Sequence, residues 1–215
     1  MLLAVLGRSP SSPPAVPGPV ESMRLLLAGW TEQAPDDGMR FWRAADGAVL
    51  SLAASSGELL VAASEADLQR SARLLAESGG AGLIEVDRMS PSPGPMVRLV
   101  YKRLQGRAYI YTGMLIIAGE EDILAWTIVD GEGPETGVRE AAITAELMGS
   151  GQLTLEEYQR SWAQDPYDPA YGGVDRRALR FLSDDERYDA RFPQHPLSRV
   201  RRVLQALPGS VAGRF

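Results

Sequence analysis

The single histidine of this chain, His195, lies in the segment FPQHPLS and is the side chain best suited to proton transfer near neutral pH. As a general acid or base oriented by Asp185 or Asp189, it would belong to a small hydrolase-like enzyme. No serine near it lies in a nucleophile-elbow pattern, so His195 would have to perform the chemistry alone. We therefore favour the alternative, a loop residue that forms local hydrogen bonds, and we assign no catalytic residue.

Metal ligands are scarce in this sequence. One histidine excludes multi-histidine sites, and the absence of cysteine excludes thiolate sites, disulfides and cysteine nucleophiles. Asp165, Asp168 and Asp175 carry oxygens of the kind that calcium prefers, but their spacing does not match the EF-hand loop, and Asp-Pro pairs favour turns. We predict neither a metal nor another cofactor.

Two further stretches match a functional site only in part. Glu120, Glu121 and Asp122 are neighbouring carboxylates, but they fall at the tip of a predicted hairpin, where acidic side chains are solvated. The glycine-containing stretch 131–137 precedes a predicted helix, yet it lacks the lysine of a phosphate-binding loop and carries two glutamates that would repel an anion. We interpret the stretch 131–137 as an ordinary strand-to-helix loop.

Arginines on a predicted C-terminal helix are the candidates for contact with a partner. A guanidinium group binds carboxylates well, so this helix would suit an acidic partner. The alternative is pairing within the chain to the acidic run 184–189. We predict that another protein, so far unidentified, binds a surface formed by Arg199, Arg201, Arg202, Trp162, Tyr167 and Tyr171.

Composition excludes two classes of partner. The net charge of −6 and the pI near 5.0 argue against nucleic acid, because affinity for phosphate requires a basic field. No apolar run approaches the roughly 18 residues of a membrane span, so we expect no membrane partner. The N-terminus lacks the order of basic, apolar and small residues of a signal peptide, which favours a cytoplasmic protein.

The 215 residues are enough for one domain with a substantial core. We predict a disordered leader rich in proline and serine at 1–22, a sheet domain at 23–150, and a helical extension at 151–215 packed on the same domain. The predicted strands lie at 23–28, 39–44, 48–54 and 82–88, followed by a three-stranded meander over 97–131. The predicted helices lie at 65–77, 136–148 and 155–165, with two more between 184 and 207. Their predicted capping residues are Ser64, Thr136, Thr154 and Ser183. The apolar stripe expected on the helix at 136–148 consists of Val138, Ala141, Ala142, Ala145 and Met148.

The order of these elements is a strand followed by Trp30, a hairpin, a helix, a strand, a meander and a C-terminal helix. Together with AGW at 28–30, DGAVL at 46–50 and GRAY at 106–109, this order resembles the PsbP-like superfamily over about residues 25–150. The resemblance implies an antiparallel sheet packed against helices in a small binding or adaptor protein. It transfers no functional residue, and the segment 152–207 has no counterpart in it.

We therefore predict an α+β fold with one antiparallel sheet of about six strands. The helices at 65–77 and 136–148 should cover one face, and the C-terminal helices should wrap an edge. The predicted function is that of an intracellular bacterial binding or adaptor protein. The alternatives are the hydrolase-like enzyme and an immunity-type protein, since charge complementarity speeds association of an acidic protein with its partner.

Overall fold

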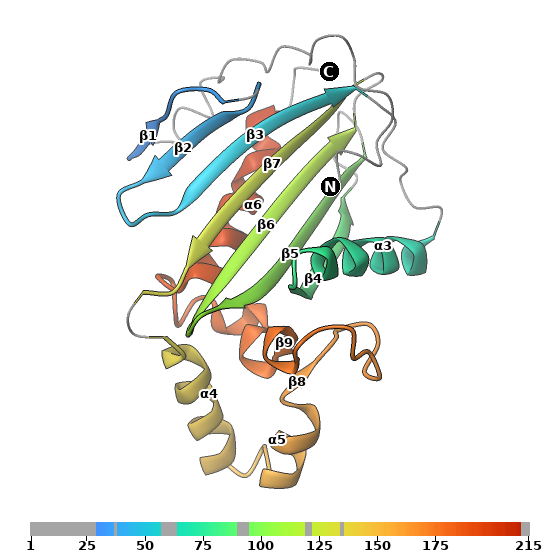
Figure 1. The fold of residues 1–215 in the computed structure, drawn as a ribbon. Coiled ribbons are helices and arrows are strands. Elements are labelled where there is room, and N and C mark those ends of the chain that lie inside the picture. The colour runs from blue at the N-terminus through green and yellow to red at the C-terminus, as the bar shows by residue number, and fades with distance from the viewer. Residues whose placement is uncertain are drawn as a thin grey trace.

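Seven strands form one antiparallel sheet in the order β1-β2-β3-β7-β6-β5-β4 (Figure 1). The computed structural model describes residues 29–36, 38–56, 64–89, 95–118, 122–133 and 136–211, so the predicted leader and the strand at 23–28 lie outside the described residues. The α+β class is confirmed, with seven strands in place of about six. The strands are β1 (Trp30–Glu32), β2 (Arg40–Ala44), β3 (Val49–Ser56), β4 (Gly82–Met89), β5 (Met96–Gln105), β6 (Ala108–Ala118) and β7 (Asp122–Gly131).

The sheet consists of two sequence-local units that meet at β3 and β7. The first unit contains the β2–β3 hairpin, whose turn requires the positive φ of +96° at Gly47. The second is the predicted meander, extended by β4. Strand β3 pairs with β7 from Val49 opposite Val129 to Ser56 opposite Asp122, which joins the two units into one sheet.

Side chains alternate between two buried faces of the sheet. On β5, Met96 and Val100 face one core cluster, and Val97 and Leu99 face another. Helix α6 (Pro196–Val211) packs on the first face through Leu197, Val200, Leu204 and Leu207, and helix α3 (Glu65–Ser78) packs on the second through Leu68 and Ala72. Because both faces of the central strands are apolar, the sheet is the middle layer of the molecule.

The predicted placement of the helices is therefore wrong in two respects. Helix α6 lies on a face of the sheet and not along an edge, and its approach depends on Gly113, where a Cβ atom would stand 2.5 Å from Val200 Cγ1. Helix α4 (Val138–Gly149) covers no sheet face and lies beyond one end of the sheet (Figure 1). Its predicted apolar stripe was also wrong, because Val138 is exposed and the buried residues are Arg139, Glu140 and Ile143.

The C-terminal part forms a third core cluster below the end of the sheet. Residues Ile143, Leu153, Trp162, Phe181 and Tyr188 pack together there. The predicted helix between 184 and 192 is instead a series of 3-10 turns, and a two-stranded ribbon was not predicted. These elements are α5 (Leu155–Ser161), β8 (Ala163–Gln164), η1 (Arg176–Ala178), β9 (Arg180–Phe181), η2 (Leu182–Asp184) and η3 (Glu186–Tyr188).

Two of the four predicted helix caps are confirmed, and the one at Ser183 is wrong because Ser183 lies inside the 3-10 turn η2. Ser64 accepts a hydrogen bond from the amide of Asp67, and Thr154 forms the predicted capping box with Glu157. Helix α4, in contrast, begins after Gly137 at a φ of +76° and has no side-chain cap. The hydroxyl of the predicted cap, Thr136, donates to Glu132 instead.

Candidate functional site

The sheet face under the start of α6 changes from apolar to polar at its end. Val100 and Gly113 pair across β5 and β6 in the apolar region, and the next inward-facing pair is Lys102 opposite Tyr111. Both of these side chains are fully buried, because the segment 182–198 covers them. The sheet thus ends in a buried layer of polar groups.

Lys102, the only lysine of the chain, forms a fully buried ion pair. Its Nζ lies 2.6 Å from Asp184 Oδ2, and both side chains are 0% exposed. The same carboxylate oxygen accepts a hydrogen bond of 2.7 Å from the Phe181 amide, and the ammonium group stacks on the Phe181 ring. Burial lowers the pKa of Lys102, and the charge of Asp184 offsets part of this effect.

Arg139 of α4 attaches the covering segment to the rest of the site. Its guanidinium group is fully buried and donates to the carbonyls of Ser183 and Asp185, to the Asp189 carboxylate and to the Ser198 hydroxyl. Each of these groups belongs to the segment 183–198. One side chain therefore fixes the 3-10 turns and the start of α6 relative to α4.

Glu132, Glu140 and His195 form a cluster next to the Lys102–Asp184 pair. One ligand-type atom from each lies within 4.8 Å of the others, and His195 Nε2 stands 3.5 Å from Glu132 Oε1. Glu140 is only 9% exposed, and neither of its carboxylate oxygens has a hydrogen-bond partner among the described residues. The Tyr111 hydroxyl is likewise buried without a partner, and the Tyr111 ring meets the His195 ring edge-on at 5.3 Å.

The two glutamates of this cluster have opposite pKa shifts. Burial raises the pKa of Glu140, and repulsion from Asp184 raises it further. Burial alone would raise the pKa of Glu132 too, but the nearby imidazole of His195 and hydrogen bonds from Thr136 and the amides of Tyr109 and Gly137 together lower it. Burial also raises the pKa of Tyr111 well above its ordinary value, and the nearby carboxylates add to this shift. Glu132 is thus an anion held by hydrogen bonds, and Glu140 is a buried carboxyl group whose oxygens have no hydrogen-bond partner among the described residues.

His195 lies in this buried cluster and not on a convex loop. Its acidic neighbour is Glu132, so the expected orienting residues are corrected: Asp189 binds Arg139 and Arg201, and Asp185 binds Arg180 and Arg187. His195 Nδ1 accepts a hydrogen bond of 3.3 Å from the Leu197 amide at the start of α6. The local hydrogen bond expected from the sequence is present, and no serine or threonine hydroxyl of the described residues bonds to the imidazole.

The arginines of the predicted surface form most of their contacts within the chain. Arg199 pairs with Asp130 and Asp46, and Arg201 is buried against Glu85 and Asp189. Pairing of Arg201 to the acidic run is the alternative that the sequence left open. Arg202 donates to the Pro193 carbonyl. A partner at this surface stays a prediction.

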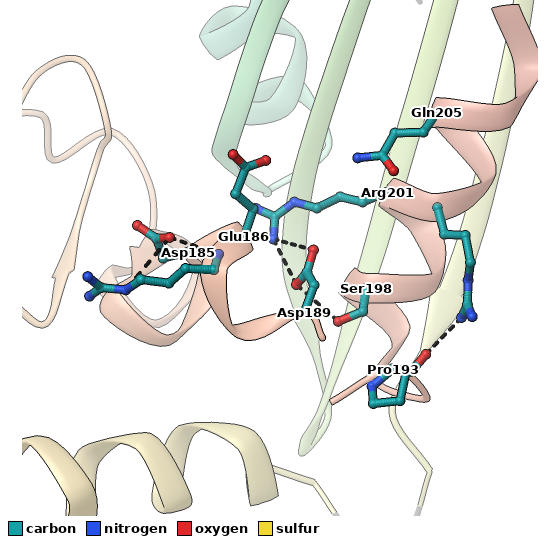
Figure 2. A pocket seen from close by; sticks show the side chains of 9 residues that line it. Asp185, Glu186, Asp189, Pro193, Ser198, Arg201 and Gln205 are labelled. Atoms are coloured by element: carbon teal, nitrogen blue, oxygen red, sulfur yellow. Dashed lines mark hydrogen bonds and ion pairs between the residues drawn. The ribbon is translucent and has the colours of Figure 1, made fainter. Parts of the chain in front are cut away.

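The arginines border a pocket of about 580 Å³ between η3 and α6, shown in Figure 2. Arg201 reaches from α6 to Asp189, and Asp189 also contacts Ser198 (Figure 2). Three arginines and three acidic residues line this pocket, so their formal charges cancel. The lining residues are Asp185, Glu186, Arg187, Asp189, Pro193, Ser198, Arg201, Arg202 and Gln205.

The aromatic residues of the predicted surface also serve the fold. Trp162 is buried in the third core cluster, and the Tyr167 hydroxyl both accepts from the Val86 amide at 2.9 Å and donates to the Val86 carbonyl at 3.1 Å. Tyr171 donates to Glu77, and Arg73 stacks on its ring. The three aspartates considered for calcium do not gather: Asp165 pairs with Arg73, Asp175 pairs with Arg177, and Asp168 accepts from the Ala170 amide.

A second pocket, of about 510 Å³, opens between α4, α5 and β9. Aromatic rings form much of its wall, Glu140 contributes to its lining, and Arg176 and Arg177 lie at its exposed side. The lining residues are Tyr109, Gly137, Glu140, Tyr158, Gln159, Trp162, Ala163, Arg176, Arg177 and Phe181. Glu140 therefore belongs both to this pocket and to the buried cluster.

Sequence reasoning missed the residues of the buried cluster except His195. The available signal was Lys102, because a single lysine in register with Val100 on an alternating strand places a charge on an apolar face. Glu132 was assigned to an ordinary loop, and Glu140 fell outside the expected buried stripe of its helix. Their approach to His195 depends on contacts between segments more than fifty residues apart, for which the sequence contains no local pattern.

Comparisons with known proteins give no relative from which a function could be transferred. No family model matches the chain, and no curated protein matches it. The resemblance to the PsbP-like superfamily stays a prediction. Among the described helices, none combines the length and apolar character that crossing a bilayer requires.

Proposed function

We propose that this protein is a non-enzymatic binding protein, and that the pocket between α4, α5 and β9 holds a small ligand with a flat apolar body and an anionic group. The observation that carries the proposal is a continuous aromatic wall next to an arginine, Arg176, that pairs with no carboxylate of the described residues. A pocket of about 510 Å³ lies within the range of roughly 300 to 1,000 Å³ that small-molecule sites occupy.

The aromatic wall supports a flat apolar ligand. Neighbouring rings follow one another at centroid distances of 5.1 Å for Tyr158 and Trp162, 6.2 Å for Trp162 and Phe181, and 5.5 Å for Phe181 and Tyr109. Aromatic side chains favour offset or edge-on contact with other rings, and such contacts add to the effect of burying apolar area. The wall is fixed because Trp162 and Phe181 belong to the third core cluster.

The arginines support an anionic group on the ligand. Arg176 donates to the carbonyl of Gln159, and this bond leaves its positive charge uncompensated. Arg177 is paired with Asp175 at 2.7 Å, so it contributes less net field. A guanidinium group presents parallel donors that match a carboxylate or phosphate, which makes Arg176 the natural anchor for the anion.

The pocket lining favours binding over catalysis. Among the described residues that line it there is no serine, threonine or histidine, and the one carboxylate there, Glu140, has both oxygens buried. A hydrolase would require an activated nucleophile or a positioned water next to a base. This composition supports the binding function expected from the sequence over the hydrolase-like alternative.

Calorimetric titration with three ligands of the same body tests the proposal. We choose 1-naphthoate, 1-naphthylmethanol and 1-naphthylmethylamine, which differ in charge at one position. We expect 1-naphthoate to bind most tightly and the amine to bind most weakly. Replacing Arg176 by glutamine should lower the affinity for 1-naphthoate several-fold and leave the affinity for the alcohol unchanged, because only the anion binds the guanidinium group.

Arg160→Gln is the matched control, since Arg160 also lies on the exposed surface near the pocket, on α5, but does not line it. This variant removes the same charge and should bind 1-naphthoate as the natural sequence does. Equal affinity for all three ligands, or equal loss in both variants, would contradict an anion anchored at Arg176. No binding of any of the three would contradict the aromatic pocket as a ligand site.

A further inference from the structure

The cluster of Glu132, Glu140 and His195 contains more negative charge than its surroundings neutralise. Two buried cations near the cluster are already engaged: Lys102 lies 2.6 Å from Asp184 Oδ2, and Arg139 donates to Asp189 and to backbone carbonyls. Glu140 is left 9% exposed with two unpartnered oxygens. A buried carboxylate without a partner is costly, so a cation at this position would stabilise the folded protein.

Around this cluster, polar atoms from different elements have no hydrogen-bond partner among the described residues. They are both Glu140 oxygens from α4, the Tyr111 hydroxyl from β6 and His195 Nε2 from the start of α6. The ligand-type atoms of Glu132, Glu140 and His195 lie within 4.8 Å of one another. These three side chains and Tyr111, whose ring contacts His195, differ from a solvated acidic patch because all four are largely withdrawn from water.

We propose that Glu132, Glu140 and His195 bind a divalent first-row transition metal ion, of the class of Zn²⁺ or Mn²⁺, with the Tyr111 hydroxyl facing the ion's remaining coordination positions. One imidazole and two carboxylates form a ligand set that such ions accept. The imidazole favours these ions over Ca²⁺ and Mg²⁺, which prefer oxygen ligands alone. The site does not depend on a ligand in the aromatic pocket.

Contacts around the cluster already orient two of the three ligands. Glu132 accepts hydrogen bonds from the Tyr109 amide at 3.1 Å and the Gly137 amide at 3.2 Å, which fix its carboxylate. The His195 ring is held edge-on against Tyr111. A hydrogen-bonded carboxylate such as that of Glu132 is typical of metal sites, where the surrounding groups set ligand orientation.

Glu140 is the ligand that moves on binding. Ligand atoms around a tetrahedral ion at about 2.1 Å stand roughly 3.4 Å apart, so a cluster whose atoms lie within 4.8 Å of one another must contract by up to about 1.4 Å. No hydrogen bond to a described residue restrains the Glu140 carboxylate. Glu140 also lines the aromatic pocket, which provides the path by which an ion enters.

Metal binding exchanges one hydrogen bond of the imidazole. Nδ1 now accepts from the Leu197 amide at 3.3 Å, which places the proton of the neutral ring on Nε2. An ion at Nε2 requires the proton on Nδ1, so this long capping bond is replaced by the metal bond. The ring nitrogens of His195 and the amide of Leu197 therefore report occupancy of this particular site.

Calorimetry on the untagged, chelator-treated full chain tests the proposal with ZnCl₂, MnCl₂, CaCl₂ and MgCl₂. We expect one Zn²⁺ or Mn²⁺ to bind per chain, and we expect the affinities for Ca²⁺ and Mg²⁺ to be at least tenfold lower. Because His195 is the only histidine, a long-range ¹H–¹⁵N spectrum of the imidazole contains one ring and should show the Nε2 signal move on saturation with Zn²⁺.

Two nearly isosteric variants and a control complete the experiment. Glu140→Gln and His195→Gln should each lower the affinity for Zn²⁺ at least tenfold. Glu146 is an exposed carboxylate on the same helix as Glu140, so Glu146→Gln should leave this affinity unchanged. Circular dichroism verifies that each variant is folded. Absence of a one-to-one Zn²⁺ or Mn²⁺ complex, or Zn²⁺ affinity that survives both substitutions, would overturn the proposal.

Discussion

Replacing Lys102 by methionine should cost far more stability than its single ion pair would cost on the surface. The substitution keeps the length of the side chain but leaves the Asp184 carboxylate, 0% exposed, with one remaining hydrogen bond, from the Phe181 amide. Removing one partner of a buried pair costs about 3 to 5 kcal/mol, because the other charge stays buried without compensation. For a chain of this size, that loss corresponds to a lower melting temperature by on the order of 10 °C.

Urea and thermal unfolding followed by circular dichroism measure this loss. Asp184→Asn should be destabilising as well, and the double variant should lose less than the sum of the two single losses, since it removes both charges together. Arg191→Met is the control, because it breaks the exposed Arg191–Glu146 pair and should leave the unfolding midpoint nearly unchanged. A loss below about 1 kcal/mol for Lys102→Met, the range of surface pairs, would refute the description of Lys102 as a buried charge.

Three further predictions follow from packing and titration. Gly113→Ala should destabilise the protein by about 1 to 3 kcal/mol in urea unfolding, because its Cβ would stand 2.5 Å from Val200 Cγ1, whereas Gly133→Ala, with no atom within 4 Å, should not. Arg139→Met should make the segment 183–198 sensitive to limited proteolysis at protease concentrations that spare the natural sequence, since four of its contacts disappear. Burial raises the pKa of Tyr109 from 10.0 to about 12. The stability that the protonated Tyr109 contributes is therefore complete below pH 10.0 and is lost as the pH rises through about 12. The free energy of unfolding, measured across this interval, should depend less on pH in Tyr109→Phe.

The parts of the fold that the sequence predicted are those with local signals. Asp46-Gly47 defines the β2–β3 turn, Ser64 begins α3, and Thr154 begins α5, each through interactions within a few residues. The alternation along β5 predicted the strand, but one of its faces was expected to be partly wet, and the face that carries Val100 and Lys102 is buried. The placement of α6 was wrong because it depends on Gly113, a glycine whose role is visible only when a distant helix packs on it.

The candidate site was predicted only through His195. Its expected acidic partners were close in sequence, but Asp189 is occupied by Arg139 and Arg201, which leaves Glu132 as the neighbour in space. Helix α4 was expected to bury alanines against the sheet. It buries Arg139 and Glu140 instead, because the segment it packs against offers carbonyl and carboxylate groups.

The position of the single lysine also determines how this protein responds to chemical modification. Its ε-amine is fully buried in the folded chain, so acylating reagents and enzymes that attach groups to lysine have no substrate there until the segment 182–198 lifts from the sheet. The rate at which Lys102 is labelled therefore reports the opening of this segment: its open fraction when reclosing is faster than labelling, and its opening rate when labelling is faster.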